Sequence, residues 1–128
     1  MWAPGIFFDE ENGDYIIHWS SSSKDTDYDG LSIFYSRTKD FQTFSEPKLF
    51  YRKSDSETLD SCIYKENGVY HFFVKSADHP KAVIHETSRS LFGPYERDRE
   101  FTFPYGFKHG VAMEITEEEY ERVLGNFQ

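Results

Sequence analysis

An internal repeat constrains this chain more than any other feature of its sequence. A short apolar segment, an Asn-Gly pair and a longer segment opened by Tyr occur over residues 7–20 and again over residues 62–75. Asn-Gly between alternating apolar runs favours a tight β-hairpin, because both residues tolerate the positive φ of a type I′ turn. We therefore predict two such hairpins, with turns at Asn12-Gly13 and Asn67-Gly68.

Each predicted hairpin is followed by two further strands. The third strands span residues 32–38 and 82–88, and the outer strands span residues 46–51 and 95–97. Aromatic residues favour strands, and the chain contains 13 Phe and 9 Tyr. The copies lie about 50 to 55 residues apart, a spacing and strand content typical of β-propeller blades.

The predicted fold class is therefore all-β. We expect residues 1–128 to form a single partial β-propeller domain with two four-stranded blades, at about residues 3–52 and 60–98. A propeller closes with 4 to 8 blades, so two blades leave faces and strand edges uncovered. The chain is then either an excerpt of a longer protein or, if stable by itself, a homo-oligomer.

Residues 101–125 differ in character, and we expect them to hold a closing strand and a short C-terminal helix. Residues 111–115 are predicted to form the strand. The helix is expected to begin at Thr116, which forms a capping box with Glu119, and to stop at Gly125.

The net charge of −9 limits the partners of the chain. Its 14 basic residues are scattered among 23 acidic ones, which argues against nucleic acid and against an anionic membrane surface, whereas a neutral partner meets no electrostatic penalty. No apolar stretch approaches the roughly 20 residues of a membrane helix, and no signal peptide opens the chain. The single cysteine, Cys62, cannot form an internal disulfide and is expected to be a buried, inert thiol.

Four segments resemble glycoside hydrolase family 43, a family of five-bladed sugar hydrolases. The chain shows them in the family's order: Trp2-Ala3-Pro4 with Phe7-Phe8-Asp9, Leu59-Asp60-Ser61-Cys62-Ile63, Thr87-Ser88-Arg89-Ser90-Leu91-Phe92-Gly93-Pro94-Tyr95 and Phe103-Pro104-Tyr105-Gly106-Phe107-Lys108-His109-Gly110-Val111. The resemblance implies an α-L-arabinofuranosidase or β-xylosidase activity on plant polysaccharide in an intact relative, with a carbohydrate partner and no cofactor. Full-length relatives are often secreted or periplasmic.

The resemblance also implies three carboxylates around a central tunnel, of which this chain matches one. Asp60 stands at the position of the residue that tunes the pKa of the general acid. The general base belongs to a first blade that has no counterpart here, and the Glu-Gly-Pro phrase of the acid is missing. Inverting hydrolysis needs both an acid and a base, so we expect no turnover by the isolated monomer. Without the resemblance, Asp60 is a turn-end residue that bonds to backbone.

Two further residues are candidates for substrate binding. Trp2 could stack on a sugar, and His109 matches a histidine that relatives carry near the propeller axis, although a His before Gly is more often a loop residue. Gly5 stands where relatives often have Glu. The aspartates of residues 25–29 lack the Glu of a calcium loop, and we predict no metal site. A non-catalytic carbohydrate-binding module and a self-assembling fragment are the alternatives to a hydrolase.

Overall fold

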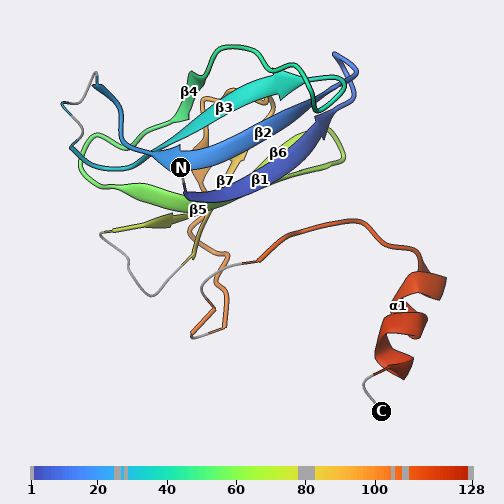
Figure 1. The fold of residues 1–128 in the computed structure, drawn as a ribbon. Helices are drawn as coiled ribbons and strands as arrows, with labels where there is room; N and C mark the ends of the chain where they lie inside the picture. Colours follow the sequence, from blue (N-terminus) through green and yellow to red (C-terminus); the bar gives the residue numbers. More distant parts are fainter. Residues whose placement is uncertain are drawn as a thin grey trace.

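The computed structural model describes residues 2–24, 27, 29–77, 83–104, 106–107 and 110–126, and it contains two four-stranded antiparallel sheets (Figure 1). The first blade consists of β1 (Trp2–Asp9), β2 (Asp14–Ser21), β3 (Ser32–Thr38) and β4 (Lys48–Tyr51). The second blade consists of β5 (Thr58–Glu66), β6 (Val69–Ser76), β7 (Val83–Ser88) and β8 (Glu96–Arg97). In both sheets the strands lie in chain order, which confirms the prediction of an all-β, partial propeller-like fold.

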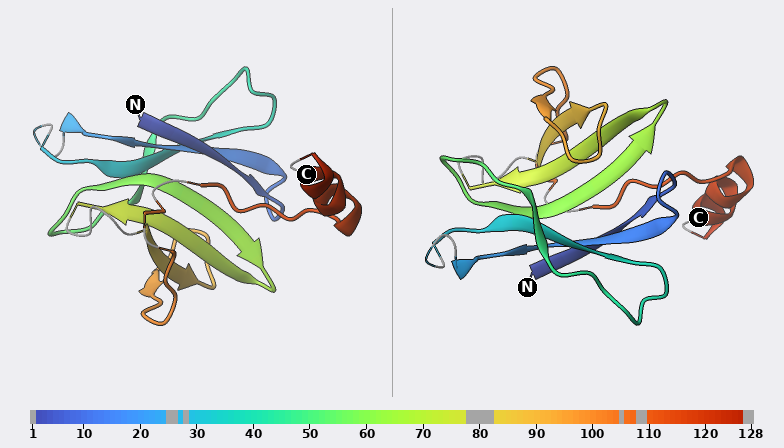
Figure 2. Two further views of the ribbon diagram at one scale, coloured as in Figure 1. Left: turned by 90° about the horizontal axis from the view of Figure 1, so that it is seen from below. Right: turned by 90° about the horizontal axis from the view of Figure 1, so that it is seen from above.

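The two blades pack face to face, with their first strands, β1 and β5, lying side by side (Figure 2). The core lies between the sheets and takes its buried side chains from both of them and from the turn after β7: Ile16, Ile33, Phe50, Ile63, Tyr70, Phe72, Val74, Ile84 and, in that turn, Leu91. Burial of each large apolar side chain contributes about 1.5 to 3 kcal/mol, so each blade depends on the other for its buried face.

The two hairpin turns differ, which corrects one of the two turn predictions. Asn67 and Gly68 have φ of 50° and 74°, as the predicted type I′ turn requires. The first hairpin instead has a four-residue turn, because the Asp9 carbonyl accepts the N–H groups of Asn12 at 3.2 Å and Gly13 at 2.8 Å. The Asp9 carboxylate also accepts the Asn12 side-chain amide at 2.8 Å, so local side-chain bonding selects the longer turn.

Both inner strands contain an irregularity at the same place in the blade. The register of β1 against β2 shifts between Trp2 and Gly5, and that of β5 against β6 shifts between Leu59 and Cys62. Ala3 and Asp60 occupy these two shifts with φ of 44° and 55°. Such bulges bend a strand and re-aim its side chains, so Ala3 and Asp60 are structurally matched positions.

The predicted closing strand over residues 111–115 is wrong. These residues cross the inner strands without strand pairing, held by the Ala112 N–H, which donates to the Cys62 sulfur at 3.4 Å. The bulges interrupt the edges of β1 and β5 that a closing strand would need. Val111 and Met113 are therefore left 72% and 69% exposed.

The predicted C-terminal helix is confirmed as α1 (Glu117–Gly125), which projects away from the blades (Figure 1). Thr116 and Glu119 form the expected capping box, and the helix ends at Gly125, as predicted, with Asn126 as its C-cap. No residue of α1 is buried. Among the described residues, no helix is long and apolar enough to cross a membrane.

Candidate functional site along the inner strands

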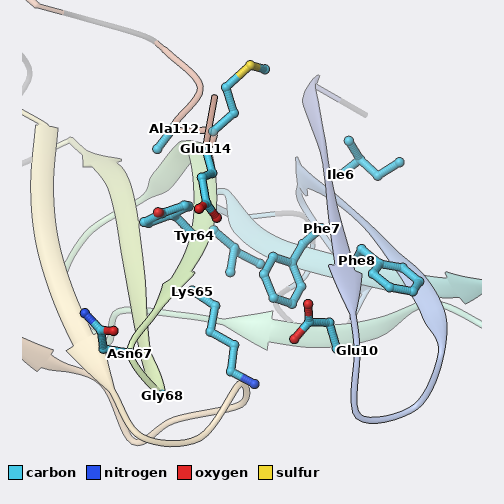
Figure 3. A pocket seen from close by; sticks show the side chains of 12 residues that line it. Ile6, Phe7, Phe8, Glu10, Tyr64, Lys65, Asn67, Gly68, Ala112 and Glu114 are labelled. Atoms are coloured by element: carbon cyan, nitrogen blue, oxygen red, sulfur yellow. The ribbon is translucent and has the colours of Figure 1, made fainter. Parts of the chain in front are cut away.

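Three cavities follow the inner strands β1 and β5, and residues 110–114 contribute to each of them. The end cleft, about 490 Å³, lies beside the two hairpins (Figure 3). The His18 cavity, about 330 Å³, lies between the strands, and the Asp60 cavity, about 150 Å³, lies against the second blade. The inner strands thus carry the candidate site, and the C-terminal segment partly fills it.

The bulge in β5 positions the predicted site residue Asp60. Its side chain is 11% exposed, and its Oδ2 lies 3.5 Å from the Lys75 ammonium nitrogen. The Asp60 backbone N–H donates to the Ser20 hydroxyl of the first blade at 3.3 Å. A positive φ at a residue other than glycine costs about 1 to 3 kcal/mol and is found disproportionately at functional sites. The structure therefore places Asp60 in a strained bulge within a strand, between the two blades.

Aromatic rings form the wall of the Asp60 cavity. Phe103 lies 5.6 Å from Phe73 and 4.9 Å from Phe101 between ring centroids, and it stacks on Phe107 at 4.4 Å. A cavity of this volume holds a ring about the size of benzene. The cavity thus places one carboxylate beside flat apolar rings.

The carboxylates near the inner strands are divided between two cavities. Asp60 is the one carboxylate among the described residues that line its cavity. Glu10 and Glu114 line the end cleft and enter it from opposite sides (Figure 3). Lys65, also in that cleft, pairs with Glu11 at 3.0 Å and lies 4.9 Å from the Tyr70 ring centroid. Asp60 and the two glutamates of the end cleft therefore line different cavities.

His18 fills the centre of the first blade beside the His18 cavity. It is 1% exposed, and its Nδ1 lies 2.8 Å from the Ser61 hydroxyl oxygen. Burial lowers its pKa to about 4, so the imidazole is neutral at pH 7. A Cβ at Gly5 would clash with the His18 ring, which explains the glycine at this position.

The other predicted site residues do not join Asp60 in one cavity. Trp2 is 66% exposed at the start of β1 and lines none of the three cavities. His109 lies outside the described residues, as does Asp25 of the aspartate-rich loop. The described part of the chain groups no three His, Cys, Asp or Glu side chains that could hold a metal ion.

The thiol prediction is confirmed, and two features of the site were missed. Cys62 is buried and desolvation raises the pKa of its thiol, which keeps it protonated. His18 was not singled out, because its role depends on a contact with another blade. The phenylalanines of residues 101–107 were recognised only as an aromatic, turn-rich run, although their density was the available signal for a ring-lined wall.

Comparison with known proteins identifies the family. A family model described as "Probable glycosyl hydrolase domain", related to glycoside hydrolase family 43, matches residues 1–99. A solved structure titled "Glycoside hydrolase" is similar with a TM-score of 0.60 and 18% identity, over 84% of this chain and 25% of that chain. This chain thus spans about a quarter of the length of that structure. A search of the curated proteins found no match to this chain. The chain belongs to the family of glycosyl hydrolase domains related to glycoside hydrolase family 43.

Proposed function

We propose that this chain binds a carbohydrate built from arabinose or xylose and, as an isolated chain, does not hydrolyse it. The observation that carries the proposal is the Asp60 cavity, where one carboxylate adjoins a wall of phenylalanine rings. Membership in a glycosyl hydrolase family supports a sugar as the ligand. Asp60 would accept hydroxyl hydrogens of the ring that it adjoins.

The division of the carboxylates supports binding without turnover. Inverting glycosidases hold an acid and a base about 6.5 to 9.5 Å apart, and retaining enzymes hold two carboxylates about 5 to 5.5 Å apart. No carboxylate other than Asp60 is among the described residues that line this cavity. A sugar held there would meet one carboxylate and not the pair that hydrolysis needs.

The test is a titration of the purified chain with arabinan and xylan oligosaccharides, followed by NMR or calorimetry. We expect binding to weaken at least tenfold in Asp60→Asn and in Phe103→Ala, whereas Glu114→Gln, in the end cleft, serves as the matched control and retains it. We expect no release of nitrophenol from aryl arabinofuranosides or xylosides. Binding unaffected by Asp60→Asn would contradict the site, and turnover abolished by Asp60→Asn would contradict the non-hydrolytic role.

Self-assembly is the second candidate function, and the outer face of the first blade favours it. Ile6, Phe8, Phe41 and Leu49 are each about half exposed, at 46% to 56%. A second copy would cover them, and salt would strengthen the contact because each copy carries a charge of −9. Light scattering should then show a discrete oligomer that Phe8→Ser converts to monomer. A monomer at all salt concentrations would exclude this candidate.

A further inference from the structure

Two histidines and an aspartate link the second blade to the aromatic wall of the Asp60 cavity. We call the described residues 98–104 and 106–107 the aromatic flap. At its start, Asp98 Oδ2 lies 3.0 Å from His85 Nδ1, and His85 Nε2 lies 2.9 Å from His71 Nδ1. Asp98 Oδ1 accepts the backbone N–H groups of Glu100 at 3.0 Å and Phe101 at 3.2 Å. One carboxylate therefore holds both His85 and the first turn of the flap.

The partners assign the proton positions in this chain of hydrogen bonds. An ionised carboxylate only accepts, so the proton between His85 and Asp98 is on His85 Nδ1. Neutral His85 then accepts at Nε2, and His71 must donate from Nδ1. The planes of the His71 and His85 rings differ by 1°, and the ring centroids are 5.2 Å apart. A proton added to His85 can enter only at Nε2, where it would face the His71 N–H.

The surroundings of His85 make that added charge costly. The residue is 6% exposed, with the Phe73 ring at 4.8 Å and the Phe101 ring at 4.6 Å. Desolvation is the largest cause of its lowered pKa, and the charge of His71 lowers it further, against an opposing effect of Asp98. Among the described residues, His71 on β6 and Asp98 after β8 are the titratable groups that face His85 from these two segments.

Other charged groups near this arrangement point elsewhere. Glu86, next to His85 on β7, accepts the Tyr51 hydroxyl hydrogen at 3.0 Å on the opposite, inter-blade face. Arg99 and Glu100, beside Asp98 in the flap, are exposed to solvent. From β5, the uncharged Tyr64 ring contacts His71 at 6.1 Å, beyond the histidine pair. The protonation of His85 is therefore governed by His71, Asp98 and burial.

We propose that the Asp98–His85–His71 chain is a pH-sensitive latch, which holds the aromatic flap over the Asp60 cavity when His85 is neutral and releases it when His85 is protonated. A proton on His85 Nε2 breaks the bond with the His71 N–H and leaves a charge between phenylalanine rings. Release exposes His85 to water, where its pKa returns toward the ordinary value.

The sign of the pH dependence follows from this difference. The docked flap disfavours the protonated imidazole, so docking is fully stable above the ordinary histidine pKa of 6.5 and weakens as the pH falls below it. One proton is linked to release. The ratio of docked to released flap therefore falls by up to about tenfold per pH unit between that value and the lowered pKa of docked His85.

The experiment is aromatic NMR of the full chain, with no sugar present, over pH 7.5 to 5. We expect the cross-peaks between the Phe101 and His85 rings and between the Phe73 and Phe103 rings to decline below pH 6.5. The Phe50–Phe72 pair in the core, 5.4 Å apart, is the internal reference and should persist. If the flap cross-peaks and the Phe50–Phe72 cross-peak decline at the same pH, the proposal is wrong, because the whole protein is then unfolding.

Two variants separate the latch from general acid sensitivity. His85→Gln can still donate to Asp98 and does not titrate, so its flap cross-peaks should be independent of pH. In His71→Gln the amide oxygen can accept from protonated His85, so the decline should move to lower pH, because burial among the rings still opposes the charge. If His85→Gln fails to fold, His71→Gln decides the question. A wild-type decline in either folded variant would refute the proposal, whatever the outcome for sugar binding.

Discussion

The two blades have the same strand order and the same bulge in the inner strand, but they differ in what covers their outer faces. The first blade leaves Ile6 and Phe8 about half exposed on its outer face. The second blade has Phe73 and His85 on its outer face, and the flap residue Phe101 covers them. One blade is thus completed within the chain, whereas the other presents apolar surface to a partner or to solvent.

The matched bulges show how one framework supports two different interiors. In the first blade the bulge holds Ala3, and Gly5 pairs with His18, whose ring occupies the space above the glycine. In the second blade the bulge holds Asp60, and Cys62 pairs with Phe73. A charged side chain in the bulge and a ring beside it therefore distinguish the candidate binding blade from its structural twin. Three matched positions differ in side chain: Ala3 and Asp60, Gly5 and Cys62, and His18 and Phe73.

The largest expected effect tests whether the blades form one unit. Phe72 is fully buried between them, and Phe72→Ala should lower the free energy of unfolding by about 3 to 5 kcal/mol. Phe8→Ala, on the bare face, is the matched control and should cost about 0.5 kcal/mol. Urea unfolding followed by circular dichroism and, in a Trp2→Phe background, by Trp19 fluorescence should give coincident transitions. Loss of the second blade with Trp19 still buried would show that the first blade is independent.

Acid should destabilise the first blade through His18. The matched position in the second blade is Phe73, which does not titrate. The folded pKa of about 4 is lower than the ordinary 6.5, so below pH 6.5 the unfolded chain binds a proton that the folded chain excludes. Stability is therefore lost progressively between pH 6.5 and 4, by about 3 kcal/mol in total. His18→Gln should remove this part of the loss in urea unfolding at several pH values. An unchanged pH profile in the variant would contradict the assignment to His18.

The bulge residues give the next effect. Gly5→Ala places a Cβ against the His18 ring and should cost about 1 to 3 kcal/mol by overpacking. The matched substitution in the second blade is Cys62→Ala, which leaves a small void and should cost about 1 kcal/mol. Thermal unfolding of both variants measures the contrast. Equal costs would mean that His18 moves freely, and the proposed reason for the glycine would be wrong.

The smallest effect concerns the helix α1. Thr116→Ala removes the capping hydroxyl and should cost about 1 kcal/mol of helix stability. No residue of α1 is buried, so the unfolding midpoint of the blades should remain unchanged while the helical circular dichroism signal falls. A lower midpoint for the blades would indicate that α1 packs on them in solution.

Much of the fold was predictable because it follows from local patterns. Alternating apolar residues and the turn at Asn67-Gly68 determine the second hairpin, and the repeat of these patterns gave two blades. The turn after Asp9 was not predictable from Asn12-Gly13 alone, since side-chain bonds to Asp9 lengthen it. The bulge at Ala3 was equally hidden, because alanine disfavours a positive φ, whereas aspartate adopts one more readily than most residues.

The site was less accessible to sequence analysis than the fold. The family resemblance singled out Asp60, but its role in binding or catalysis remains a prediction. The environment of Asp60 depends on Phe73, Phe101 and Phe103, which come together only when the chain after β8 folds back over the second blade. The latch has the same origin, since His71 and His85 meet through strand pairing, and Asp98 joins them from beyond β8.

The segment that crosses the inner strands has a consequence for affinity. Residues 110–112 line both the His18 cavity and the Asp60 cavity, so a ligand that needs the full width of this region must displace a piece of the same chain. The segment is a tethered competitor at fixed effective concentration, which dilution of the protein cannot remove. The apparent dissociation constant of such a ligand equals the intrinsic one divided by the fraction of molecules in which the segment has moved away.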